Sequence, residues 1–350
     1  MKRIELLDYG RFLAIIGVVA FHYFFNGIAN GKISSITYIP GISEIAKYGY
    51  LGVEFFFMIS GYVIFFSAQN KTASEFAMAR AVRLYPAFWF AVIFTSIFAF
   101  FWGGKQMSVS PTQIAINFTM IAPVFGHNFV DGVYWVLPYE LKFYLLVLIF
   151  LLLGIQTKLK TVFFLWPFAL LLCKLSGQHL PYLDSYYCYF AAGAILAIMK
   201  NNLTPKLAVA LLICLILCIS FSIANTPPVV KSKNSDLVIA LIITILFLFF
   251  LCVNSEKGSD LKLYGSRVLG DLSYPIYLIH AHFGYMLISQ FATEKNKYII
   301  YIVTVLLVFM VACLMNIFVE KRLLKMWKMF FQKTIGDLIS NIDRQLAGIR

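Results

Sequence analysis

The chain of 350 residues is 61% hydrophobic and only 13% charged, and its formal net charge is +13. Because about a quarter of the residues of an ordinary soluble domain are charged, this composition excludes a water-soluble globular protein. The basic excess does not indicate nucleic-acid binding, since it gathers between long apolar runs, each near the ~20 residues that a helix needs to cross a bilayer. We therefore predict an all-α, polytopic integral membrane protein with about ten transmembrane helices.

The predicted spans follow the apolar runs in chain order. They lie near residues 8–26, 49–68, 86–103, 137–154, 161–176, 181–199, 207–224, 237–253, 269–291 and 298–319. If the N-terminus is cytoplasmic, basic residues concentrate in the inside segments, above all from Lys321 to Lys333, and are sparse in the outside loops. This asymmetry predicts that both termini are cytoplasmic.

Two segments outside the spans are amphipathic. Residues 104–136 form the longest outside segment and are expected to be a lid or a re-entrant element. The basic tail, residues 321–350, is expected to lie as a helix on the anionic inner leaflet. The chain thus divides into a transmembrane domain, residues 1–320, and a cytoplasmic tail.

The first span carries Arg11 and His22 on one helical face, about 16 Å apart along the axis. Charged groups at membrane depth normally line a bundle interior or a water-filled cavity, so this face predicts a functional site. The alternative is structural: Arg11 would extend its charge to the membrane surface and His22 would be a hydrogen-bonded core imidazole.

The second and fourth spans each place a carboxylate in the outer half of the membrane. Glu54 lies six residues before Ser60, and Glu140 lies five residues after Trp135. Ser60 and Trp135 are themselves candidates for a polar face that contacts substrate or holds the helices together. Both acids are expected in the layer of His22, where a carboxylate would orient the imidazole as a general base for a hydroxyl. Alternatively, each acid belongs to a buried ion pair that holds helices together.

Two further stretches carry candidate binding residues. Arg80 and Arg83 share a helical face at the cytoplasmic side, and arginine forks suit phosphate oxygens, although arginines are common at that side of any membrane protein. The ninth span presents a polar face formed by Ser273, Tyr274, Tyr277 and His280. His280 and His282 point in different directions, so no metal site is expected from this pair.

These stretches together resemble the membrane acyltransferase-3 family, which includes bacterial O-acetyltransferases of surface polysaccharides. The resemblance rests on the ordered motifs Arg11 with His22, Gly52 to Tyr62, Arg80 to Trp89, Trp135 to Tyr144, Ser273 to His280 and Phe318 to Lys321. It implies a multi-pass protein of the bacterial inner membrane that transfers an acetyl group from acetyl-CoA to a glycan hydroxyl. Many relatives continue into an extracytoplasmic SGNH hydrolase-like domain, which we do not expect here, so the chain would work alone or with a separate periplasmic partner.

The resemblance and the residues together give a mechanistic hypothesis. Arg80 and Arg83 would hold the phosphates of CoA at the cytoplasmic side, and the pantetheine arm would pass Arg11 to reach His22. His22 would act as a general base or as a transient acyl carrier, oriented by Glu54 or Glu140, on a glycan acceptor that is either free or lipid-linked. The alternative function is a transporter or flippase for a lipid-linked glycan or a small solute that uses the intramembrane acids.

Overall fold

The computed structural model describes residues 3–69, 71–200 and 203–347, and these residues form helices and loops without a β-strand. The first two residues of the predicted domain and the last three of the predicted tail lie outside the described residues. The all-α, polytopic membrane fold predicted from composition is confirmed.

Within the described residues, seven helical segments are long and apolar enough to cross a membrane. They are Glu5–Ala29, Ile42–Gln69, Ala73–Trp102, Gly132–Leu152, Pro205–Ala224, Ser235–Asn254 and Lys297–Arg322. The other predicted spans coincide with α9 (Leu159–Leu175), α10 (Tyr187–Met199) and the pair α14 (Ser266–Ile279) and α15 (Ala281–Phe291). Each predicted span therefore falls on helical structure, whereas the number that cross the membrane and their orientation remain predictions.

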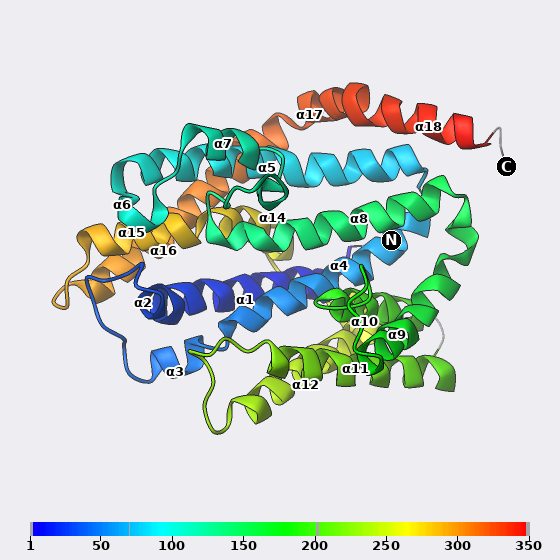
Figure 1. Cartoon of the computed structure of the whole chain (residues 1–350), viewed down its shortest axis with the longest axis horizontal. Helices are drawn as coiled ribbons and strands as arrows, with labels where there is room; N and C mark the ends of the chain where they lie inside the picture. The colour runs from blue at the N-terminus through cyan, green and yellow to red at the C-terminus, as the bar shows by residue number, and fades with distance from the viewer. Residues whose placement is uncertain (1–2, 70, 201–202, 348–350) are drawn as a thin grey trace.

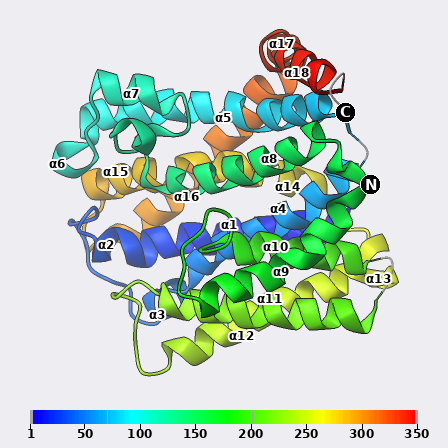
Figure 2. The ribbon, with the colours of Figure 1, turned by 45° about the vertical axis from the view of Figure 1, so that its right-hand side comes forward.

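The long helices run side by side along the molecule (Figure 1). The central ones are α1 (Glu5–Phe21), α4 (Gly52–Gln69), α5 (Ala73–Trp102), α8 (Val136–Leu152) and α16 (Lys297–Leu314). On one side of them lie α9, α10, α11 (Pro205–Ala224) and α12 (Ser235–Asn254), and on the other α17 (Leu324–Phe331) and α18 (Asp337–Ala347) cover α5 (Figure 2). The start of α1 and the C-terminal helix α18 lie at the same end, as an even number of crossings would require.

Short helices join these elements at the two ends of the bundle. They are α2 (Gly27–Ala29), α3 (Ile42–Ala46), α6 (Gly104–Met107), α7 (Pro111–Asn117) and α13 (Glu256–Asp260). Glu294, before α16, accepts hydrogen bonds from Lys297 Nζ at 2.7 Å and from the Thr37 N–H at 2.5 Å. This carboxylate ties the loop after α2 to the start of α16.

Glycines allow α10 to pack directly on α4. A Cβ at Gly193 would lie 2.0 Å from the carbonyl oxygen of Met58, and one at Gly61 would lie 2.1 Å from that of Phe190. Small residues at such contacts let membrane helices approach to backbone distance. The short helix α10 is buried along its whole length as a result.

The helix α5 begins 13 residues earlier than the predicted span. Thr72 and Glu75 form a capping box that fixes its start, and the helix continues through Pro86. A proline inside a long membrane helix is tolerated where neighbouring groups satisfy the freed backbone. Arg80 and Arg83 therefore belong to the same continuous helix as the membrane span that follows them.

The outside segment 104–136 folds back along α5. Phe118 places its carbonyl oxygen 3.0 Å from Trp89 Nε1, near the middle of α5. Asn117, whose side chain is fully buried, accepts a hydrogen bond from the Val130 N–H at 3.0 Å and closes the returning loop. This segment therefore packs against α5 as far as the middle of that helix, and its role as a lid or a re-entrant element in the membrane stays a prediction.

The tail after the last span is helical and rests on the protein. Trp327 and Phe331 of α17 each lie 5.9 Å, between ring centroids, from Trp89 of α5. Ser74 Oγ donates to the carbonyl of Gly336 at 2.8 Å. Part of the apolar face expected to contact lipid is therefore covered by α5.

Candidate functional site

The end of α1 is locally widened where the candidate base is found. Residues His22–Asn26 form a π-helical segment between α1 and α2, and such single-turn widenings are frequent at functional sites. Within it, His22 Nδ1 lies 3.4 Å from Asn26 Nδ2. The hydroxyl of Tyr285, from α15, hydrogen-bonds to the same ring nitrogen and accepts from Asn26 Nδ2 at 3.1 Å.

His280, from the ninth predicted span, lies beside His22, and its own ring is held by a backbone carbonyl. The His280 ring packs edge-on against His22 at 4.9 Å between centroids, and His280 Nδ1 is 2.8 Å from the carbonyl oxygen of Tyr277. His280 is fully buried, and its Nε2 has no hydrogen-bond partner among the described residues. His280 therefore supports the wall behind His22 and does not line the cavity in front of it.

An outer cavity of about 330 Å³ opens in front of His22. Its polar lining comes from His22, Asn26, Lys32, Tyr50, Glu54, Trp135, Tyr186, Ser222, Asn225, Tyr277, His282 and Tyr285. Glu54 is 4% exposed, and its Oε2 has no hydrogen-bond partner within the described parts of the chain. Glu54 thus shares the cavity of His22, as predicted, but it does not bond to the imidazole.

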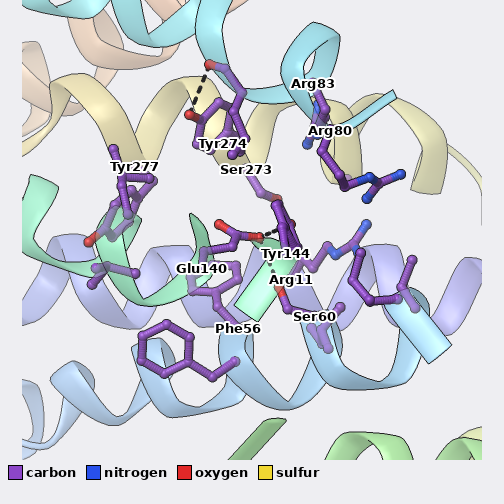
Figure 3. A pocket seen from close by; sticks show the side chains of 18 residues that line it. Arg11, Phe56, Ser60, Arg80, Arg83, Glu140, Tyr144, Ser273, Tyr274 and Tyr277 are labelled. Carbon is purple, nitrogen blue, oxygen red and sulfur yellow. Dashed lines mark hydrogen bonds between the residues drawn. The ribbon is translucent and has the colours of Figure 1, made fainter. Parts of the chain in front are cut away.

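A smaller cavity of about 120 Å³, called the inner cavity below, lies among α1, α4, α5, α8 and α14 (Figure 3). It is lined by all three predicted donor-binding arginines together with polar residues of α4, α8 and α14: Arg11, Arg80, Arg83, Ser60, Glu140, Tyr144, Ser273, Tyr274 and Tyr277. In Figure 3 the arginines gather at one side of this cavity and Tyr277 lies at the other.

Glu140 belongs to the inner cavity, so its predicted place in the layer of His22 is wrong. It accepts a hydrogen bond from Ser60 Oγ at 3.0 Å and another from the Tyr144 hydroxyl. The step of five residues from Trp135 to Glu140 moves the carboxylate about 7.5 Å along the helix, out of the outer cavity that Trp135 lines and into the inner one. Asn26 and Tyr285, and not a carboxylate, contact His22.

The arginines of the inner cavity differ in how their charges are balanced. Arg83 pairs with Glu320 at 3.3 Å, and Arg11 lies 3.7 Å from Asp8. Arg80 stacks over the ring of Tyr144, 5.7 Å from its centroid, and its Nε has no hydrogen-bond partner among the described residues. Its guanidinium is the member of the set best placed to receive an added anion.

Tyr277 is the residue that lines both cavities. Its hydroxyl donates to the carbonyl of Val133 at 2.6 Å, and its ring packs edge-on against Phe56 at 6.2 Å between centroids. Its neighbour Tyr274, one turn earlier, lines the inner cavity alone and donates to the carbonyl of Leu84 at 3.1 Å. Tyr277 therefore separates the arginine-lined space from the histidine-lined space.

Sequence reasoning missed three residues near His22. Asn26 lies one turn beyond His22, a spacing that could have signalled it, and Tyr285 extends the polar run of the ninth span. Lys32 belongs to an outside loop of the predicted topology, and no local pattern in the sequence shows that this loop folds over the cavity. Within the described chain, no group of three or more His, Cys, Asp or Glu side chains could hold a metal ion.

Comparison with known proteins gives one assignment. A family model described as an acyltransferase domain matches residues 4–319, nearly the whole chain. Neither the curated proteins nor the solved structures contain a significant match to the chain. The matched range includes both cavities and every residue that contacts His22.

Proposed function

The chain belongs to the membrane acyltransferase-3 family, and we propose that this multi-pass acyltransferase moves an acetyl group from cytoplasmic acetyl-CoA to a hydroxyl of a surface or periplasmic glycan. Its place would be the bacterial inner membrane, which separates cytoplasmic acetyl-CoA from periplasmic and surface glycans. The observation that carries the proposal is the pair of cavities that meet at Tyr277, one lined by arginines and the other by His22.

The donor would enter at the inner cavity. Arg80, with no carboxylate within 4.0 Å among the described residues, and Arg83 suit the phosphates of CoA. The pantetheine arm would extend past Arg11 toward Tyr277. Since Arg11 and His22 are about 16 Å apart along α1, an extended arm matches the distance that the acetyl group must travel.

The acceptor would occupy the outer cavity. Trp135 and Tyr186, 5.0 Å apart between ring centroids, offer flat apolar faces against which a sugar ring can pack. Asn225 and Ser222 add hydrogen-bonding groups for sugar hydroxyls on the same wall.

The chemical step would take place at His22. The Tyr285 hydroxyl hydrogen-bonds to Nδ1 and also accepts from Asn26 Nδ2, so Nε2 is the ring nitrogen left for the reactants. When Nδ1 carries the ring hydrogen and donates to the Tyr285 oxygen, Nε2 can accept the proton of the acceptor hydroxyl. The hydroxyl oxygen then bonds to the acetyl carbon, the carbon–sulfur bond breaks, and the proton passes from His22 to the CoA sulfur.

In a second route, His22 would form a covalent intermediate with the acetyl group, and the overall reaction would be the same. Nε2 would attack the thioester carbon, the carbon–sulfur bond would break, and CoA would leave as a thiolate that takes up a proton from water. Nε2 would then carry the acetyl group until the acceptor hydroxyl displaces it. Glu54, buried in the same cavity, would then accept the hydroxyl proton. An acetyl-imidazole is trapped by hydroxylamine, so hydroxylamine-sensitive radiolabel on the protein would distinguish this route from direct transfer.

The test is acetyl transfer by purified protein. We expect His22→Ala to lower the rate ~10²- to 10⁴-fold, the usual contribution of a positioned base. Glu140→Gln is expected to act on the donor side and to change the KM for acetyl-CoA, because Glu140 lines the same cavity as the three arginines. Near-normal kinetics in both variants would contradict the proposal.

Donor binding is tested separately by thermal stabilisation of the detergent-solubilised protein, since a ligand that binds only the folded state raises its melting temperature. CoA is expected to stabilise the native protein and to lose this effect in Arg80→Met. The matched control is Arg322→Met, because Arg322 lies outside both cavities over the ring of Phe318. Absence of any shift with CoA, together with solute movement across vesicles, would instead indicate a transporter.

A further inference from the structure

We propose that the outer cavity contains a subsite for an anionic oxygen group of the acceptor, a carboxylate or a phosphate, bound by Lys32 beside Gly132. This inference rests on the proposed function, in which the outer cavity holds the acceptor. It specifies the chemical class of that acceptor.

The backbone of Lys32 is held in place at the cavity rim. Its N–H donates to Asn30 Oδ1 at 3.1 Å, and its carbonyl accepts from Ser289 Oγ at 2.6 Å. The next residue, Ile33, donates to the carbonyl of Gly27 at 2.8 Å. The side chain therefore starts from a fixed point between α2 and α15.

The ammonium group of Lys32 has a neutral partner. Its Nζ lies 2.8 Å from His282 Nε2, while His282 Nδ1 lies 3.0 Å from the carbonyl oxygen of Val130. Because that carbonyl can only accept, Nδ1 carries the ring hydrogen and Nε2 is the acceptor for Lys32. The imidazole orients the ammonium and leaves its charge in place.

No carboxylate neutralises this charge by direct contact within the described parts of the chain. Asp131 acts on this charge electrostatically, and its oxygens accept the N–H groups of Val133 at 3.2 Å and His282 at 2.9 Å. Burial is the largest influence on the pKa of Lys32 and lowers it, and Asp131 opposes this shift. The ammonium is thus poorly solvated and can gain from an added anion.

Space for that anion lies next to Gly132. A Cβ at this position would be 3.7 Å from Lys32 Nζ and 3.4 Å from His282 Nε2, so the missing side chain leaves the approach to the ammonium open. Lys32 Nζ is also 5.8 Å from the ring centroid of Tyr285, whose hydroxyl contacts His22. An anion bound there would stand beside the reacting hydroxyl.

The lining of the rest of the cavity favours the end at Lys32 as the place for a negative group. Glu54 lines the same cavity together with Tyr50 and Tyr186, which carry no positive charge. A carboxylate or phosphate would be attracted by Lys32, and no cationic side chain of the described residues lies at the end of the cavity lined by Glu54, Tyr50 and Tyr186, so one acceptor orientation would be preferred. The anion could belong to an acidic sugar or to the phosphate of a lipid carrier.

The experiment compares charged probes with neutral probes of matched shape on the full-length purified protein. The sugar arm uses methyl glucuronide against methyl glucoside, and the lipid arm uses a polyprenyl phosphate against the corresponding polyprenol. Binding is measured by calorimetry. We expect at least one charged probe to bind ~10-fold or more tightly than its neutral partner, which is typical of a hydrogen bond to a charged group.

Three variants show whether Lys32 causes the preference. Lys32→Gln keeps a donor for His282 but removes the charge and is expected to abolish the preference, and Lys32→Arg is expected to retain it. The control is Lys47→Met, because Lys47 already pairs with Glu44 at 2.6 Å outside the cavity. CoA-induced stabilisation in each variant confirms folding and tests the donor site independently.

Equal affinity for charged and neutral probes in both arms would overturn the inference, as would a preference that survives Lys32→Gln. If Lys32→Gln does not fold, the comparison of charged with neutral probes on the native protein still tests whether the cavity binds anions. A preference for anions in a protein that fails to bind CoA would support the subsite and contradict the proposed acetyl donor, so the two failures are distinguishable.

Discussion

Replacement of Tyr277 tests whether the two cavities are separate chambers. The hydroxyl of Tyr277 donates to the Val133 carbonyl at 2.6 Å, and the residue lines both cavities. Tyr277→Phe keeps the ring but loses a buried hydrogen bond worth about 1 to 1.4 kcal/mol. A loss of this size corresponds to a ~5- to 10-fold larger population of conformers in which the barrier between the cavities is open. Tyr277→Ala removes the ring and joins the cavities.

The assay is release of CoA from acetyl-CoA without an acceptor, followed with a thiol reagent. When the barrier between the chambers opens, water from the outer cavity can reach the thioester, so acceptor-independent hydrolysis should rise several-fold in Tyr277→Phe and further in Tyr277→Ala. Tyr274→Phe is the matched control, because it loses a hydrogen bond to the Leu84 carbonyl at 3.1 Å but lines only the inner cavity.

The outcome that refutes this reasoning is specific. If Tyr277→Ala is stabilised by CoA as the native protein is, and yet hydrolyses acetyl-CoA no faster, Tyr277 does not separate donor from water. A rise of equal size in Tyr274→Phe would show instead that loosening α14 anywhere has the same effect.

Three further predictions follow from the contacts around the site and the core. Tyr285→Phe removes the hydrogen bond to His22 Nδ1 and is expected to lower kcat about tenfold with little change in KM; a change in KM alone would contradict a role in orienting the base. Gly193→Ala is expected to destabilise the detergent-solubilised protein by about 1–3 kcal/mol, since its Cβ would overlap the α4 backbone, whereas Gly17→Ala, with its nearest neighbour at 3.7 Å, should melt near the native temperature. Hydrogen bonds from the start of α16 and from the loop after α2 lower the pKa of Glu294 in the folded state, so the native protein should be more stable than Glu294→Gln at neutral pH and lose this advantage as the pH falls through that lowered pKa; a pH-independent difference in melting temperature would contradict this.

The sequence by itself determined the class of the protein and the composition of its site. Apolar runs of membrane length fix helices, because a bilayer leaves no other way to satisfy the backbone of a single-chain span. A charged or polar group within such a run must face the interior, so Arg11, His22 and Glu54 could be placed on cavity walls without coordinates. The order of short motifs was sufficient to indicate the family that the comparison then showed.

Only the tertiary structure decided which of these residues share a space. Depth along a predicted span is uncertain by about one turn, and at 1.5 Å per residue that error is enough to move Glu140 from one cavity to the other. The partners of His22 come from the π-helical segment that follows α1 and from α15, and Lys32 reaches the outer cavity because a loop folds over it. Contacts between segments far apart in the chain leave no local pattern, so Tyr285, Lys32 and the separating position of Tyr277 became visible only when the helices were packed.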